Sequence, residues 1–208
     1  MDIQFYGANC LVLATKNARI LIDDNLADLG GKSPAKAGDI VLFTGAHGEA
    51  AQAARIVIDH PGEFEVAGVS INGIAARSHM DEEGKRSATM YKLLIDDVRV
   101  LVTGHIYPEL SDDQLEAIGM VDVMLVPVGG NGYTLDGVGA LKVVKEVEPK
   151  VVVPTHYDAK GLQFPVPQQP LEEGLKALAM EPKETTSKLK VKSGELGDVT
   201  QLVVLEQS

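Results

Sequence analysis

Short apolar runs separated by turn residues dominate the first half of the chain. The runs are alternating or continuously apolar over the length of a strand, and pairs such as Lys16-Asn17 and Gly30-Gly31 interrupt them. This pattern predicts β-strands at residues 3–6, 10–14, 19–23, 39–44, 56–58 and 65–74. The alanine-rich stretch 50–55 predicts one or two helical turns before the fifth strand. We therefore expect meander-like β-structure in this half.

Helical spacing of apolar residues enters only in the second half. Strands are predicted at 89–95, 98–103, 123–126, 151–153 and 199–205, and helices at 111–118, 137–147 and 171–179. The first helix begins with Ser111 and has Gln114 three residues later, which is the spacing of a capping box. Strands first, with helices after each half, predict one α/β (α+β) domain over 1–208. In it, two sheets pack face to face between helices, so that loops at one edge converge.

Four of the five histidines stand just past predicted strands, in well-separated segments. They are His47, His79, His105 and His156. Loops on a rigid scaffold often supply side chains that meet at one point, and neutral imidazole is a common ligand of zinc-like cations. A lone loop histidine is more often a surface residue, but four such placements together predict a metal site. His60, before Pro61-Gly62, is interpreted as a turn residue.

Composition and charge indicate a soluble protein that does not bind nucleic acid. The 208 residues are 45% hydrophobic and 24% charged, as in a soluble globular protein. The 30 acidic residues exceed the 19 lysines and arginines, which gives a net charge of −11. Nucleic-acid binding needs basic residues to neutralise phosphates, so this charge argues against nucleic acid as a partner. The only basic cluster, 183–192, is interleaved with acidic and hydroxyl residues and is interpreted as a solvated face.

The cellular compartment is predicted from cysteine content and from the absence of targeting segments. Cys10 is the only cysteine, so no intramolecular disulfide can form, and its apolar surroundings favour a buried side chain over a nucleophile. No apolar run approaches the roughly 20 residues that span a bilayer. The first residues, MDIQFYG, lack the basic and apolar regions of a signal peptide. A cytoplasmic protein without a membrane partner is therefore expected.

Several segments, in this order, resemble the metallo-β-lactamase fold superfamily. They are GANC at 7–10, LID at 21–23, DIVLFT at 39–44, PGEFE at 61–65, SH at 78–79, VPVGG at 126–130, YTL at 133–135 and PTHY at 154–157. Within this superfamily of metal-dependent hydrolases, the chain is most similar to the group that includes ascorbate-phosphate lactonase-like proteins. The resemblance implies a four-layer αββα sandwich and hydrolysis of an ester, lactone or phosphodiester.

The resemblance also implies a degenerate metal motif. The family's first motif is Thr-His-x-His-x-Asp-His, and the preceding strand aligns its four ligands with Gly45, His47, Glu49 and Ala50. The family's later ligand positions match His79, His105 and His156, with His105 in place of a bridging aspartate. Two cations at about 3.5–4 Å need an anionic bridge to offset their repulsion. Loss of that bridge implies that a two-metal centre is not retained.

Two functions remain open from the sequence. In the first, His47, His79, His105 and His156 bind one zinc, manganese or iron ion. Four imidazoles would close a tetrahedral site, whereas three and a water molecule would leave one position open, with Glu49 as the base on that water; the sequence does not decide between the two. Asp81 and Tyr157 are then the first candidates to orient the ligands. In the second, the protein is catalytically inactive and binds a ligand or a partner in the old cleft; the small residues at Gly45 and Ala50 favour this reading. A metal-free pocket in which the histidines bond one another and nearby acids such as Glu49 also stays open. Both functions predict a small-molecule substrate or ligand and leave a homo-oligomer open, whereas an RNA-processing nuclease conflicts with the charge.

Overall fold

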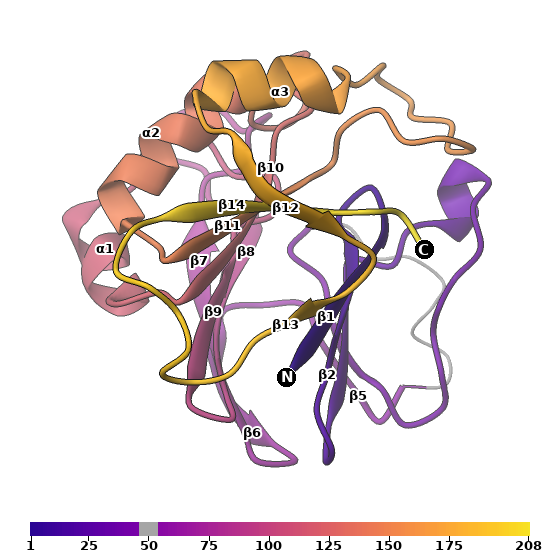
Figure 1. Ribbon diagram of the computed structural model, residues 1–208, viewed down its shortest axis with the longest axis vertical. Helices are drawn as coiled ribbons and strands as arrows, with labels where there is room; N and C mark the ends of the chain where they lie inside the picture. The colour runs from indigo at the N-terminus through magenta and orange to yellow at the C-terminus, as the bar shows by residue number, and fades with distance from the viewer. Residues whose placement is uncertain (46–53) are drawn as a thin grey trace.

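The computed structural model of the protein describes residues 1–45 and 54–208, and its strands form two mixed sheets (Figure 1). The first sheet has six described strands in the order β13-β1-β2-β3-β4-β5. Their bounds are β1 Asp2–Gly7, β2 Cys10–Ala14, β3 Arg19–Ile22, β4 Ile40–Leu42, β5 Ile56–Ile58 and β13 Leu189–Lys190. The N-terminal meander is thus confirmed, and it is closed at one edge by a strand from the far end of the chain.

The second sheet has eight described strands in the order β12-β14-β11-β10-β9-β8-β7-β6. Their bounds are β6 Gly62–Val66, β7 Val69–Ala76, β8 Ala88–Ile95, β9 Val98–Val102, β10 Val123–Pro127, β11 Val151–Thr155, β12 Pro182–Thr186 and β14 Gln201–Leu205. Strands β6 to β9 pair antiparallel, whereas β9, β10, β11 and β14 run parallel.

Both faces of the first sheet are buried, and strand alternation divides its side chains between two cores. Ile20 and Ile22 of β3 belong to the large core, which includes residues of both sheets, whereas Leu21 between them joins a smaller cluster on the opposite face. Leu29, Leu162 and Phe164 pack against that smaller cluster. A 3-10 helix, η1 (Ala27–Leu29), lies on this side of the molecule (Figure 1). Within the described residues, this helix and neighbouring loops form the outer layer of the first sheet.

Three α-helices lie against the second sheet, away from the first (Figure 1). They are α1 Asp112–Ile118, α2 Gly137–Val147 and α3 Leu171–Leu178. Ser111 and Gln114 form the predicted capping box at the start of α1. Helices α2 and α3 pack so closely that a Cβ atom at Gly137 would lie 2.3 Å from the backbone oxygen of Gly174, so glycine is required there. The predicted α+β arrangement of two face-to-face sheets between helices is confirmed.

The structure corrects several local predictions. The single strand expected at 65–74 is a hairpin, β6 and β7, with Ala67 and Gly68 at its turn in left-handed backbone conformation. Strands β12 and β13 were missed, because their side chains are largely exposed and their charge pattern indicated only a solvated face. Strand β11 continues through Pro154 to Thr155. The helical turns predicted at 50–55 fall mostly outside the described residues.

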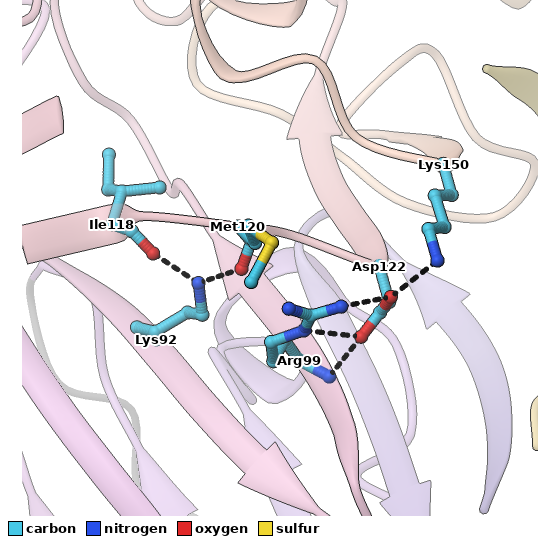
Figure 2. Close-up of polar contacts among 6 residues, drawn as sticks. All are labelled: Lys92, Arg99, Ile118, Met120, Asp122 and Lys150. Atoms are coloured by element: carbon cyan, nitrogen blue, oxygen red, sulfur yellow. Dashed lines mark hydrogen bonds and ion pairs between the residues drawn. The ribbon is translucent and has the colours of Figure 1, made fainter. Parts of the chain in front are cut away.

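Parallel pairing gives the second sheet two chemically different ends. At the amino ends of β9, β10 and β11, Asp122 accepts two hydrogen bonds from the guanidinium of Arg99, at 2.8 and 2.9 Å, and lies 3.5 Å from Lys150 Nζ (Figure 2). At the carboxyl ends of the same strands, the chain enters the loops that contain His105 and His156. None of the helices in the described ranges is long and apolar enough to cross a membrane.

Candidate functional site

His105 and His156 lie side by side at the carboxyl ends of the parallel strands. His105 follows β9 and His156 follows β11, with β10 between these strands. The ring centroids are 4.4 Å apart and the ring planes are nearly perpendicular, at 84°. Tyr133 and Phe164 flank the pair, with centroids 5.0 Å from His105 and 5.2 Å from His156, respectively. The predicted convergence of strand-end histidines is therefore observed for this pair.

Both rings line a cavity of about 230 Å³ between the two sheets' loops. Asn9, Asp23, Asp28, Leu29, Tyr133 and Phe164 are among the other lining residues. The wall thus combines aromatic and aliphatic side chains with a few polar groups, as is usual for small-molecule sites.

Both imidazoles are held in the neutral form. Burial lowers the pKa of His156 to about 4, partly opposed by its hydrogen bond to Gln168. Burial also places the pKa of His105 well below its usual value, and repulsion from His156 and His79 adds to this effect. Only neutral imidazole offers a lone pair to a metal ion, so both rings have the protonation state that a ligand requires.

Gln168 orients His156. The amide nitrogen of Gln168 donates to the carbonyl of Val166 at 2.7 Å, which leaves its oxygen to face His156 Nδ1 at 3.2 Å. His156 therefore carries its proton on Nδ1 and its lone pair on Nε2. The backbone at His156 is left-handed, with φ of 49°. Gly129 allows this path, since a Cβ atom there would lie only 1.9 Å from the His156 backbone oxygen.

His105 is held through one nitrogen only. Its Nε2 lies 3.2 Å from the side-chain nitrogen of Asn9, whose amide oxygen accepts a 2.8 Å hydrogen bond from Thr155 Oγ1. Its Nδ1 is shielded from solvent and has no hydrogen-bond partner among the described residues. A buried polar nitrogen without a partner is rare, and it indicates a group that the described chain does not supply.

A buried carboxylate, Asp23, stands beside the histidine pair in the cavity wall. It accepts hydrogen bonds from the backbone nitrogen and the hydroxyl of Thr44, at 2.7 and 2.6 Å. Burial raises the pKa of Asp23 to about 6, although the bonds from Thr44 oppose the rise. Gly104 lies against the same threonine, because a Cβ atom there would be 2.3 Å from Thr44 Oγ1. The loop before His105 is thereby fixed to the first sheet.

His79 lies in a neighbouring cavity of about 410 Å³, whose lining also includes Tyr107 and Lys142. Its ring centroid is 6.0 Å from that of Tyr107, and its Nδ1 is 3.4 Å from the Ile106 carbonyl oxygen. Its backbone nitrogen donates to the His105 carbonyl at 2.7 Å. The backbones of His79 and His105 are therefore neighbours, but their side chains line different cavities.

The remaining predicted site residues, His47 and Glu49, lie outside the described residues. Within 1–45 and 54–208, no three His, Cys, Asp or Glu side chains form a group that could hold a metal ion. The described part fits a metal through two neutral imidazoles. One of them is oriented by Gln168, and the other has an unpartnered buried nitrogen. A complete ligand set requires a further donor.

Two residues expected to orient the ligands do other work. Asp81 accepts hydrogen bonds from the backbone nitrogens of Ser78 and Ser87 and so closes its own loop. The Tyr157 hydroxyl donates to the Leu205 carbonyl at 3.3 Å. These two expectations were wrong because acidic character and sequence proximity to a histidine do not fix where a side chain points. Asn9 and Gln168 orient the pair instead; Asn9 lies in the GANC segment, whereas no motif marks Gln168.

The class of the protein follows from its fold, its site and a family comparison. Residues 2–156 match the family described as the Beta-lactamase superfamily domain, so the chain belongs to that superfamily. A Thermotoga maritima member of the metallo-β-lactamase superfamily, whose structure is known, superimposes with a TM-score of 0.76. It is 26% identical, and the alignment covers 99% of this chain and 98% of that one. The metallo-β-lactamase fold expected from the sequence is confirmed.

Sequence relatives include two archaeal proteins. A UPF0173 protein of Pyrococcus abyssi is 26% identical over 194 residues, which cover 77% of this chain and 85% of the relative. A UPF0173 metal-dependent hydrolase of Thermoplasma acidophilum is 29% identical over 110 residues. That match covers 51% of this chain and only 48% of the relative's own length.

Proposed function

We propose that the protein is a metal-dependent hydrolase whose site holds one metal ion instead of two. The observation that carries this proposal is the pair of neutral, adjacent imidazoles, His105 and His156, in a partly apolar cavity at the strand ends. Membership of the superfamily supports it. So do the relatives, because the Thermoplasma protein bears the name metal-dependent hydrolase.

The proposed ligands are His105, His156 and His47, the last taken from the sequence pattern. His79 stays a predicted fourth ligand, and its position in the neighbouring cavity makes it the least supported of the four. Zinc, manganese and iron all accept imidazole nitrogen. A bound ion would polarise the scissile group and lower the pKa of a water molecule.

The chain's own residues supply orientation and proton transfer. Gln168 holds the His156 ring through Nδ1, which keeps the Nε2 lone pair available. Glu49 is proposed to accept a proton from the attacking water. The cavity of about 230 Å³ suits a small substrate, and Leu29 and Phe164 give it an apolar wall. An ester, lactone or phosphodiester of a small molecule is the proposed substrate class, with no part for nucleic acid.

Metal content tests the proposal directly. Protein purified without chelator, or reloaded with zinc, manganese or iron, should contain about one equivalent of metal by elemental analysis. His156→Gln should lose it, and Gln168→Ala should weaken binding roughly 10-fold, because residues that orient a ligand affect affinity by about 10- to 100-fold. His60→Ala, at a side chain 63% exposed and paired with Asp59, is the matched control and should keep the metal. Wild-type protein that stays metal-free after reloading would contradict the proposal.

A second candidate is a non-catalytic protein that binds a small ligand in the same cavity. Asn9 engages His105 Nε2, and the described residues contain no three-ligand group, which favours this alternative. A screen of esters, lactones and phosphodiesters separates the two functions. Metal-dependent turnover that His156→Gln abolishes would eliminate the non-catalytic protein, whereas ligand binding without metal or turnover would support it.

A further inference from the structure

Asn9 is fixed between the two sheets in the wall of the cavity. It lies in the turn between β1 and β2, and the residue is only 5% exposed. Thr155, at the end of β11, donates its hydroxyl to the Asn9 amide oxygen at 2.8 Å. One residue away on each side, the His156 backbone nitrogen donates to the Ala8 carbonyl at 2.7 Å. Two bonds thus clamp the turn to the strand end that precedes His156.

From this position, the Asn9 amide engages one nitrogen of His105. The Asn9 side-chain nitrogen lies 3.2 Å from His105 Nε2. If the amide nitrogen faces the ring, it donates to an Nε2 lone pair, and the ring proton is on Nδ1. If the amide is turned by 180°, its oxygen accepts from Nε2–H, and the Nδ1 lone pair is free. The Thr155 hydroxyl can donate or accept, so it satisfies the amide in both orientations.

The two orientations share one consequence. In each, Nε2 is occupied, and Nδ1 is the nitrogen that the described residues leave buried without a partner. A buried donor or acceptor without a hydrogen-bond partner destabilises the folded state by about 1–3 kcal/mol, so Nδ1 requires a further group. A metal ion meets that requirement in the second orientation, and a hydrogen-bond acceptor on a bound ligand meets it in the first.

We propose that Asn9 is the positioning residue of His105: its amide occupies Nε2 and commits the ring to act on a metal ion or ligand through Nδ1. This inference deepens the proposed function and rests on it only for the identity of the bound group. It assigns a role to a residue that carries no metal-ligand or acid–base chemistry of its own. It also makes the β1–β2 turn part of the site.

Nitrogen NMR of ¹⁵N-histidine-labelled, metal-free protein tests the role, because protonated and unprotonated ring nitrogens resonate in different ranges. Wild-type His105 should show one tautomer. Asn9→Ala should convert it to a mixture or to the opposite tautomer, and Asn9→Asp, which can only accept, should give the Nε2–H form. On titration with Cd²⁺ as a spectroscopic probe, the His105 nitrogen that binds should be Nδ1. Asn9→Ala should weaken zinc binding by about 10-fold.

Asn17→Ala, in an exposed turn of the same sheet, is the matched control and should leave every signal unchanged. Thr155→Val retains the Asn9 side chain but removes the hydroxyl that fixes its amide, so it should broaden the tautomer distribution even if Asn9→Ala does not fold. The inference is overturned if His105 keeps its wild-type tautomer in Asn9→Ala, or if Cd²⁺ binds through Nε2. If the wild-type protein binds no metal but Asn9→Ala still changes the tautomer, the hydrolase proposal fails and the positioning role stands.

Discussion

The two ends of the strands β9, β10 and β11 differ in how completely their polar groups are paired. At the amino ends, Asp122 is 5% exposed and binds the backbone nitrogen and the guanidinium of Arg99, with Lys150 beside it (Figure 2). Close by, Lys92 Nζ donates to the backbone carbonyls of Ile118 and Met120 where α1 ends (Figure 2). At the carboxyl ends, His105 Nδ1 is buried and has no partner within the described ranges.

The pKa values of Asp122, Asp23 and His156 reflect the same contrast, although burial also lowers the pKa of Lys92, near the amino ends, to about 8. Arg99 lowers the pKa of Asp122 to about 2 against the opposing effect of burial, so its charged form is stabilised. Burial raises the pKa of Asp23 to about 6 and lowers that of His156 to about 4, so at the other end the charged forms are disfavoured. Perturbed, incompletely paired groups are typical of functional sites. We infer that the paired groups at the amino ends stabilise the fold. The incompletely paired groups at the carboxyl ends lower the stability of the fold and form the functional site.

Removing Arg99 should have the largest effect on stability. Arg99→Ala leaves the buried Asp122 carboxylate with only the backbone nitrogen of residue 99 and Lys150 as partners. We expect the free energy of unfolding to fall by about 3 kcal/mol, at the lower end of the range for a broken buried pair, because Arg99 is partly exposed. Urea denaturation at pH 7 measures the change. Lys188→Ala, which breaks a more exposed ion pair with Asp2, is the control and should change stability by no more than about 0.5 kcal/mol. An Arg99→Ala effect as small as that of the control would refute the assigned role of the amino ends.

The sequence predicted the histidines at the carboxyl ends of these strands but not the ion pairs at their amino ends. The histidines at strand exits could be predicted because the position of a residue after a parallel strand determines the edge at which it lies. The pairing of His105 with His156 follows this rule. Strand β7 runs in the same direction as β9, since each pairs antiparallel with β8, so His79 lies at the same edge of the sheet. Its ring nevertheless lines a neighbouring cavity, because the local turn decides where the side chain points. Whether His47 and Glu49 join the site stays a prediction.

The contacts that finish the site were beyond sequence reasoning for a physical reason. Asn9 and Gln168 reach the imidazoles from loops that are 96 and 12 residues away in sequence from their partners. Amide side chains carry no charge, no motif marks Gln168, and the GANC segment that contains Asn9 does not indicate which side chain Asn9 contacts. The Arg99–Asp122 pair has the same difficulty, since it depends on the register between β9 and β10. The strands and helices, by contrast, follow from local periodicity.

Asp23→Asn should change the pH dependence of stability by a smaller amount. The pKa of Asp23 is raised from 3.8 to about 6 in the folded protein, so its contribution is fully present below pH 4 and is lost as the pH rises through 6. At about 1.4 kcal/mol per pKa unit, removing the ionisable group should stabilise the variant relative to wild type by about 2–3 kcal/mol more at pH 7 than at pH 4. Thermal or urea unfolding across this range measures the difference. Asp28→Asn, at an exposed carboxylate on the same cavity, controls for the lost charge, and equal slopes for Asp23→Asn and wild type would contradict the prediction.

Lys150→Met should have the smallest effect on stability. It should show how much Lys150 stabilises Asp122 compared with Arg99. Lys150 Nζ lies 3.5 Å from Asp122, but its side chain is 35% exposed, and solvent screens such a pair. Because Arg99 still holds Asp122, we expect a loss of about 0.5 kcal/mol in urea denaturation at low salt, decreasing in 1 M NaCl as screening increases. Methionine retains most of the aliphatic stem, so the variant isolates the charge. A loss as large as that of Arg99→Ala would mean that Lys150 stabilises the buried carboxylate as much as the guanidinium does. The stability of Asp122 would then depend on the number of positive charges around it and not on the two hydrogen bonds from the Arg99 guanidinium.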